Sequence, residues 1–280
     1  MNVTVPSPGG FAPSCGGVPS PAPDDAQWVL FRGDELLIAQ RDGGPCSLVT
    51  DPSSHGFTPE RVHLLGTLHG HTALVGVISP DAPLPDGIRA EGLRGAFMLL
   101  RDAEQSMAAY GAQIRHWDRT TRFCGECGRP TTPSLDVSRR AARCEACKHD
   151  WFPRVSPCVI TLVYDDAGRV LLTRQPTWPA GRYGLVAGFV EPGETLEDCV
   201  KREAREETGV ELDEVTYAGS QPWPFPHQLM VGFTARHVSG DPRPLDGELE
   251  DARWFTRDSL PILPPRFSIA RRLLDTFLSR

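Results

Sequence analysis

Apolar residues along this chain come in short runs, with turn residues between them. From Trp28 onward the runs are WVLF, ELLIA, SLVT, VHLLGTL and TALVGVI. Runs of this length are typical of strands, so we expect a small β-rich N-terminal domain. From Leu93 to about Trp117 the apolar residues recur at three- and four-residue spacing, which predicts one helix that joins two parts of the chain. We find no internal repeat in the sequence.

Strand patterns also dominate the second half of the chain, with two helical patterns among them. The segment Trp151–Asp166 is expected to contain a long strand, and the DDAGR that follows is typical of a hairpin turn. One helix is expected within Gly188–Val210 and another from about Ser268 to Leu278. Mixed strands with two helices favour an α/β/α sandwich. Further strands are expected at Val170–Gln175, near Val215–Ser220, at Leu229–Arg236 and at Ala252–Phe255.

Composition places the chain among globular proteins, because 40% of its residues are hydrophobic and 23% are charged. Residues 1–25 hold six prolines and four glycines, so we expect a flexible lead-in there. The net charge of −7 argues against a broad nucleic-acid-binding surface, and no DNA partner is expected. No signal peptide and no apolar run of membrane-spanning length is visible, so we expect a cytoplasmic protein without a membrane segment.

Four of the eight cysteines form two CxxC pairs. Cys124, Cys127, Cys144 and Cys147 give the spacing C-x2-C-x16-C-x2-C. Four thiolates suit tetrahedral zinc and leave no open position, so we expect one structural Zn²⁺ per chain in a ribbon over 119–152. The alternative, a redox-active CxxC, would normally begin a helix of a thioredoxin-like unit, and no such unit is visible.

An acidic helix follows a loop with two glycines. Thr195 stands where an N-cap would stand, and Gly209 is a plausible stop. Glu203, Glu206 and Glu207 lie at i, i+3 and i+4, so their carboxylates project from one face of this helix. Such hard oxygen ligands suit Mg²⁺ or Mn²⁺. The alternative is a solvated acidic face without a metal.

The whole stretch Gly188–Val210, GFVEPGETLEDCVKREAREETGV, reads G-x5-E-x7-R-E-A-x-E-E-x-G-V and resembles the Nudix box. The resemblance implies a Nudix α/β/α sandwich that hydrolyses a nucleoside diphosphate linked to another moiety, with more than one Mg²⁺ or Mn²⁺ per site. The implied catalytic residues are Glu203, Glu206 and Glu207. The implied metal ligands are Ala187 through its carbonyl, Glu203, Glu207 and Glu248. The implied supporting residues are Gly188, Glu194 and Arg202.

Three prolines alternate with two aromatic residues in SQPWPFPHQLM, Ser220–Met230. Proline fixes the backbone and has no amide donor, so we expect a stiff, extended surface rather than a strand of the sheet ladder. Trp223 and Phe225 presented this way can stack on a nucleobase. The alternative is a proline-rich edge loop whose aromatic side chains pack inward.

This segment resembles the SQPWPFPxSLM motif of the NADH pyrophosphatase branch of the Nudix family, the NudC type, with Gln228 in place of the usual serine. FPR-x-x-P at Phe152–Pro157 and an LPP…ARRL pattern near the C-terminus agree with that branch, so the resemblance covers roughly Phe123–Leu274. The substrate-binding residues that it implies are Phe152, Phe189, Gln221, Pro222, Trp223, Pro224, Phe225, Pro226, His227, Gln228 and Ala270.

The resemblance implies hydrolysis of NAD(H) to nicotinamide mononucleotide and AMP, removal of NAD caps from RNA 5′ ends, and a homodimer with composite sites. Open alternatives are another dinucleotide substrate, such as ADP-ribose or a diadenosine polyphosphate, and a non-catalytic NAD- or RNA-binding regulator. Arg139, Arg140 and Arg143 could belong to an RNA path or be solvated charges. The expected segments are a lead-in over 1–25, a β-rich domain with its linking helix over 26–118, the ribbon over 119–152 and the catalytic domain over 153–280.

Overall fold

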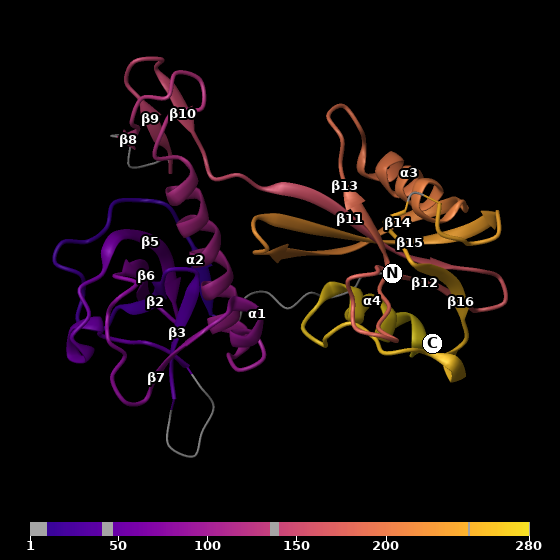
Figure 1. The fold of residues 1–280 in the computed structure, drawn as a ribbon, viewed down its shortest axis with the longest axis horizontal. Coiled ribbons are helices and arrows are strands. Elements are labelled where there is room, and N and C mark those ends of the chain that lie inside the picture. Colours follow the sequence, from indigo (N-terminus) through magenta and orange to yellow (C-terminus); the bar gives the residue numbers. More distant parts are fainter. Residues whose placement is uncertain (1–9, 41–46, 135–139, 246, 280) are drawn as a thin grey trace. The chain divides into compact units, whose positions relative to one another are not determined.

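The computed structural model describes residues 10–40, 47–134, 140–245 and 247–279. They form two compact units, one within 6–154 and the other within 155–280 (Figure 1). The finer division into four segments stays a prediction. None of the helices in these described ranges is long and apolar enough to cross a membrane.

The N-terminal unit is built on a sheet, as expected from its short apolar runs. The strand order is β1-β5-β6-β2-β3-β4, and β7 also pairs with β3. Buried Leu30, Leu37 and Leu74 form part of its core, and helix α2 packs against β5 and β6. The elements are β1 (Phe11–Pro13), β2 (Gln27–Arg32), β3 (Glu35–Ala39), β4 (Ser47–Leu48), η1 (Pro52–His55), β5 (Glu60–Leu68), β6 (His71–Ile78), β7 (Ile88–Glu91), α1 (Leu93–Ala96) and α2 (Asp102–Thr120).

A second, three-stranded sheet in this unit carries the cysteine pairs. Its order is β10-β9-β8, and all its pairings are antiparallel. The side chain of Trp117 in α2 donates a hydrogen bond of 3.0 Å to the carbonyl of Trp151, which ties the small sheet to the helix. The strands are β8 (Thr132–Pro133), β9 (Ala142–Cys144) and β10 (His149–Trp151).

The single helix expected from Leu93 to about Trp117 is wrong, because the structure has two helices there. The backbone of Arg101 is extended, so α1 cannot run on into α2. The side chain of Glu104 accepts the backbone N–H of Arg101 at 3.2 Å, which starts a new helix. The amide of Gln105 donates to two carbonyls of the intervening turn and holds it in place.

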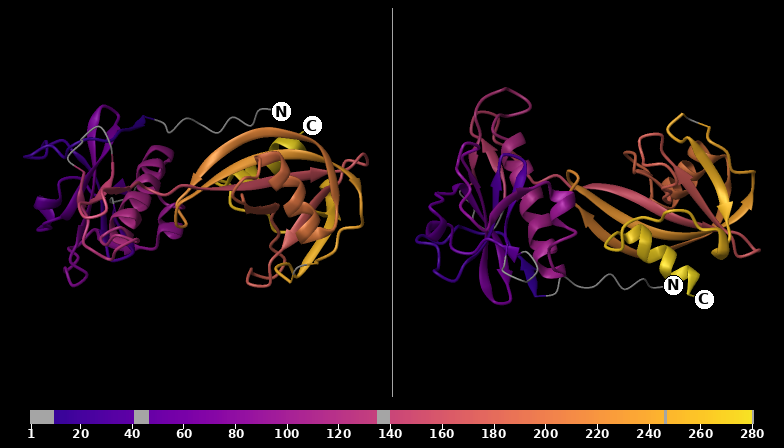
Figure 2. Two further views of the ribbon diagram at one scale, coloured as in Figure 1. Left: turned by 90° about the horizontal axis from the view of Figure 1, so that it is seen from above. Right: turned by 60° about the horizontal axis from the view of Figure 1, so that its bottom comes forward.

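The C-terminal unit is an α/β/α sandwich, which confirms the expected fold class. Its sheet has the order β14-β15-β11-β12-β16, and β13 also pairs with β11. Helix α3 packs on one face and helix α4 on the other (Figure 2). The elements are β11 (Ser156–Tyr164), β12 (Val170–Arg174), β13 (Val186–Phe189), α3 (Leu196–Thr208), β14 (Glu211–Trp223), β15 (Gln228–Ser239), β16 (Asp251–Phe255), η2 (Arg257–Ser259) and α4 (Ile269–Leu278).

The two units share one strand arrangement, although no internal repeat is visible in the sequence. The order β5-β6-β2-β3-β7 repeats the order β14-β15-β11-β12-β16. Among the described strand pairs of these two series, β2–β6 and β11–β15 are parallel and the others are antiparallel. A strand pairing is a long-range property, so two segments can share it without sharing residues. The C-terminal unit has α3 between β12 and β14. At the matching place, between β3 and β5, the described residues of the N-terminal unit form β4 and η1.

Candidate functional site

Helix α3 begins and ends where its sequence predicts. The hydroxyl of Thr195 accepts the backbone N–H of Asp198 at 3.1 Å, which satisfies one of the unpaired donors of the first turn. At the other end Gly209 has φ 75°, the left-handed conformation that glycine adopts most easily. The helix packs against β13 and β11, so its acidic residues have a fixed backbone beneath them.

The three glutamates of α3 differ in exposure. The side chain of Glu206 is 54% exposed, that of Glu203 is 13% exposed, and Glu207 is 5% exposed as a whole residue. A Cβ atom added at Gly188 would overlap the carboxylate of Glu203, so this carboxylate lies directly on the backbone of β13. Gly188 therefore makes room for Glu203, which explains why β13 needs glycine at that place.

Arg202 binds the loop and two of the helix carboxylates at once. Its guanidinium donates to both oxygens of Glu194, at 2.7 and 2.9 Å, and to the carbonyl of Phe189 at 2.9 Å. It also donates to Glu203 at 2.8 Å and to Glu206 at 2.9 Å. The hydrogen bonds from Arg202 lower the pKa of Glu194 to about 2. Such a bidentate contact fixes the loop 188–194 against the helix.

The charges of two other carboxylates act on Glu203. Burial raises the pKa of Glu203, the contact with Arg202 opposes this rise, and the charges of Glu206 and Glu248 add to it. Glu248 lies in the exposed segment before β16 and thus acts on the same site from another part of the chain. Several hard oxygens whose charges repel one another are the donor set that a divalent cation requires, so the chemistry of these residues fits Mg²⁺ or Mn²⁺.

The hairpin between β14 and β15 corrects one expectation. Ser220–Trp223 belongs to β14, and Gln228–Met230 belongs to β15, so most of SQPWPFPHQLM is strand rather than a surface outside the ladder. Pro222 pairs with Leu229 within that ladder. Proline is tolerated because β14 is the edge strand of its sheet, where an amide donor on the outer side is not needed.

The aromatic side chains of this hairpin are half-buried and stacked among themselves. The ring centroids of Trp223 and Phe225 are 5.1 Å apart in a T-shaped arrangement, and Trp223 stacks on Phe267 at 6.0 Å. The amide of Gln221 donates to the carbonyl of Phe267 at 2.8 Å and accepts the N–H of Ile269 at 2.7 Å. Sequence reasoning missed Phe267, although it lies in the LPP…ARRL segment that was singled out.

Strand register relates this hairpin to the loop before α3. Phe189 of β13, Cys158 of β11, Met230 of β15 and Gln221 of β14 are direct partners in turn, so they form one row across the sheet. Direct partners point to the same face, and three strand spacings separate the ends of the row by roughly 14 Å. Ala270 packs with Cys158 and Met230 on that face.

The remaining residues expected to bind substrate differ in their contacts and in their exposure. His227 is joined to Ser156 through its backbone carbonyl at 2.9 Å and through its ring at 3.2 Å. Gln228 pairs with Trp223 across the hairpin. Pro224 is buried, whereas Pro226 is exposed. Half of the surface of Phe189 and of Phe152 is exposed, and Phe152 belongs to the N-terminal unit.

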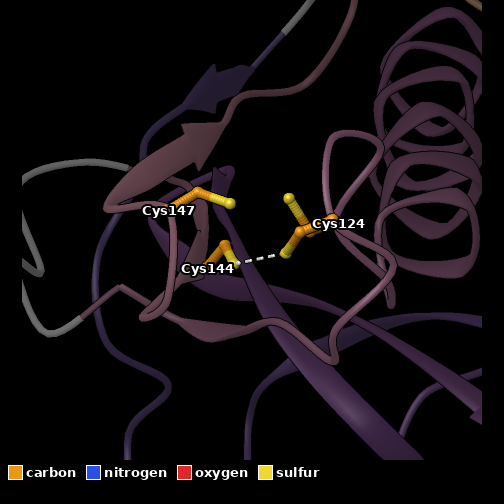
Figure 3. Close-up of side chains that lie close together, drawn as sticks. Cys124, Cys144 and Cys147 are labelled. Carbon is orange, nitrogen blue, oxygen red and sulfur yellow. Dashed lines mark hydrogen bonds between the residues drawn. The ribbon is translucent and has the colours of Figure 1, made fainter.

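The four cysteines come together as their spacing predicts (Figure 3). All the Sγ atoms of Cys124, Cys127, Cys144 and Cys147 lie within 4.8 Å of one another, and the Sγ atoms of Cys127 and Cys144 are 3.6 Å apart. Zinc–sulfur bonds in a tetrahedron require about 3.8 Å between sulfurs, so this cluster fits a structural zinc. Backbone N–H groups at Cys127 and Glu126 lower the pKa of Cys124 to about 6, which favours the thiolate form.

The cysteines and the glutamates differ in how closely they gather. Within the described ranges, the cysteines are the one group of three or more Cys, His, Asp or Glu residues whose ligand atoms all lie within 4.8 Å. Arg202 binds both Glu203 and Glu206 in this structure. The carboxylates of α3 therefore supply the right donor chemistry but are not drawn together as the thiolates are.

The arginines near the ribbon make contacts within their own unit. Arg140 donates to the carbonyl of Ser14 at 3.0 Å and to that of Leu64, and its guanidinium lies over the ring of Tyr110. Arg143 forms an ion pair of 2.8 Å with Asp150. Both side chains thus contribute to packing. Arg139 lies outside the described residues.

Comparison with known families matches both units. The NUDIX domain family matches residues 154–277. Residues 25–117 match a family described as the NADH pyrophosphatase-like rudimentary NUDIX domain. The second match agrees with the strand arrangement that the two units share, because a rudimentary domain can keep the sheet while lacking the helix that carries the glutamates.

Relatives from several bacteria match most of the chain. A protein of Deinococcus radiodurans named NAD-capped RNA hydrolase NudC is 40% identical over 92% of this chain and 90% of its own length. Proteins of the same name from Chromobacterium violaceum and Pseudomonas aeruginosa are 41% identical over 91% and 45% identical over 78% of this chain, covering 92% and 77% of their own lengths. The chain therefore belongs to the Nudix hydrolases and, within them, to the NudC family.

Proposed function

We propose that this protein hydrolyses the pyrophosphate bond of NAD(H) to give nicotinamide mononucleotide and AMP, and that it removes NAD caps from RNA 5′ ends. One observation carries the proposal: Glu203, Glu206 and Glu207 all lie on helix α3, which packs against β13. The match to the NudC relative of Deinococcus radiodurans, over 92% of the chain, supports it. A regulator that had lost catalysis would have no need of this acidic set, in which Glu203 and Glu207 are largely buried.

The acidic set also supports divalent cations as cofactors. Glu203, Glu207, Glu248 and the carbonyl of Ala187 would hold more than one Mg²⁺ or Mn²⁺, with Glu206 sharing or supporting. When bound, such ions neutralise the pyrophosphate and lower the pKa of a water. The burial of Glu203 and Glu207 supports their assignment as ligands, because a buried carboxylate is stable when a cation accompanies it.

Side chains of this chain would fix the loop 188–194, accept a proton from the attacking water and stack on the nucleobase of the substrate. Arg202 fixes the loop 188–194 through Glu194. Glu206 or Glu207 accepts a proton from the attacking water on a carboxylate oxygen. Trp223 and Phe225 stack on a base of the substrate, because their rings stand at the end of a hairpin that the sheet makes rigid.

The cysteine cluster and the assembly complete the proposal. The cluster would bind one structural Zn²⁺ per chain, because four thiolates leave no position open for a substrate. The protein would act as a homodimer with composite sites, to which Phe152 of one subunit contributes. The cytoplasmic location expected from the sequence stays a prediction.

The substrate is tested by a comparison of turnover with Mg²⁺ or Mn²⁺ on NADH, NAD⁺, an NAD-capped RNA, ADP-ribose and a diadenosine polyphosphate. The proposal predicts that the three nicotinamide substrates release nicotinamide mononucleotide and are preferred. Preference for ADP-ribose or the diadenosine compound would contradict the NAD assignment while leaving the Nudix chemistry in place.

A further inference from the structure

We propose that Gln221 is a positioning residue, not a direct substrate ligand, and that it sets the affinity for a dinucleotide by locking the aromatic hairpin to the start of α4. The inference rests on the proposed function and concerns the part of the site that binds the base. Gln221 was expected to contact the substrate, but both ends of its amide have partners within the protein.

The two hydrogen bonds of Gln221 reach across 46 and 48 residues of sequence. Its Nε2 donates to the carbonyl of Phe267 at 2.8 Å, and its Oε1 accepts the N–H of Ile269 at 2.7 Å. Ile269 is the first residue of α4, whose N–H has no partner within the helix. Gln221 therefore caps α4 from another strand, beside the local cap that Ser268 provides for Arg271.

This pair of contacts demands a side chain with one donor and one acceptor at the end of a two-carbon stem. A glutamate keeps the acceptor for Ile269 but directs a second oxygen at the carbonyl of Phe267, which repels it. A leucine has a similar size but leaves both backbone groups without their partner. Glutamine alone among the similar side chains satisfies both, so the position is defined by hydrogen bonding rather than by shape.

We call the two hydrogen bonds from Gln221 to Phe267 and Ile269 the Gln221 lock. The lock connects groups on both sides of the proposed base site. Two residues after Gln221, the ring of Trp223 stacks on that of Phe267, and Phe225 packs against Trp223. Directly after Ile269 comes Ala270, the backbone position expected to contact substrate. Gln221 thus fixes the hairpin aromatics and the first turn of α4 relative to each other. A base held between such groups depends on their spacing, and a displacement of about 1 Å can cost roughly 100-fold.

The experiment compares Gln221→Leu and Gln221→Glu with the matched control Thr216→Ala, which removes an exposed side chain of the same strand. The rate of hydrogen exchange of the Ile269 amide, measured by NMR in the substrate-free protein, reports whether its hydrogen bond to Gln221 is formed. Steady-state hydrolysis of NADH measures KM and kcat, and calorimetry with Mn²⁺ measures metal binding.

The proposal predicts faster exchange at Ile269 in both Gln221 variants and unchanged exchange in Thr216→Ala. It predicts that kcat/KM for NADH falls roughly 10- to 100-fold through KM, with Mn²⁺ affinity unchanged. Unchanged exchange would overturn the lock, and faster exchange with an unchanged KM would overturn its role in positioning. If the unaltered protein fails to hydrolyse NADH, the proposed function fails, and the exchange result still decides whether the lock exists.

Discussion

At the scale of single residues, Arg202 has the densest set of contacts around the proposed metal site. Its guanidinium bonds to Glu194, Glu203 and Glu206 and to the carbonyl of Phe189. The sequence pattern predicts a supporting pair of Glu194 and Arg202, because the Nudix resemblance supplies it. It does not predict that Arg202 also holds two of the catalytic carboxylates, since a side chain's full set of partners depends on the folded backbone.

Replacement of Arg202 by lysine is expected to lower kcat/KM roughly 10- to 100-fold, because a point charge cannot make the bidentate contact with Glu194 and the loop loses its fixed position. The matched control is Arg205→Lys, since Arg205 pairs with Glu211 on the exposed side of the same helix. Steady-state kinetics on NADH checks both variants. Equal activities for the two would show that the loop does not need the Arg202 contact.

At the scale of elements, features that depend on neighbouring residues in the sequence are predicted well, whereas features that depend on the assembled fold are not. The start of α3 at Thr195 and its end at Gly209 follow from side chains within the helix itself. The break between α1 and α2 depends on the extended backbone of Arg101, which no apolar spacing indicates. The ladder accommodates Pro222 because β14 is an edge strand, and edge position is known only once the sheet is assembled.

The junction of α2 with β5 depends on pH through Asp118. Burial tends to raise the pKa of Asp118, but hydrogen bonds from His63 and Arg61 outweigh it and lower the pKa to about 2. The carboxylate therefore stabilises the folded state above the unfolded-state pKa near 4, and this contribution is lost as the pH falls toward 2.

We expect Asp118→Asn to lower the free energy of unfolding of the N-terminal unit by ~2 kcal/mol at pH 7 and by little near pH 2. Urea unfolding of both proteins at several pH values measures the difference. A difference that stays constant with pH would mean that the charge of Asp118 does not stabilise the junction.

Zinc binding by the ribbon is expected to depend on all four clustered cysteines. Replacement of Cys144 by serine is expected to abolish zinc binding, since three thiolates no longer close the tetrahedron. Elemental analysis of the purified protein measures zinc per chain, with Cys15→Ser as the matched control because Cys15 lies outside the cluster. Full zinc content in Cys144→Ser, or none in the unaltered protein, would contradict a structural zinc site.

At the scale of the whole molecule, the two units share one strand arrangement but differ in the segment that carries the glutamates. The C-terminal unit has the acidic helix, whereas the described residues of the N-terminal unit form β4 and η1 at that place. The sequence does not reveal this repeat, because the two units share pairings rather than residues. The clustering of the four cysteines, by contrast, follows from their spacing, because each CxxC pair is local.

A composite site predicts complementation between two impaired variants. Phe152→Ala removes the exposed ring that one subunit would contribute, and Glu207→Gln removes a carboxylate of the other. Mixed dimers contain one site with both native residues, so activity on NADH should rise when the two variants are unfolded and refolded together. No rise, with dimers confirmed by sedimentation, would place each site within one subunit.

The role of Glu207 in pyrophosphate hydrolysis is tested by NADH hydrolysis by the unaltered protein and by Glu207→Gln at saturating Mg²⁺ or Mn²⁺, with products resolved. We expect the unaltered protein to release nicotinamide mononucleotide and AMP, and Glu207→Gln to be slower by roughly 10²- to 10⁴-fold while keeping its fold. Near-normal turnover by the variant, or cleavage outside the pyrophosphate, would contradict a buried Glu207 acting at that bond.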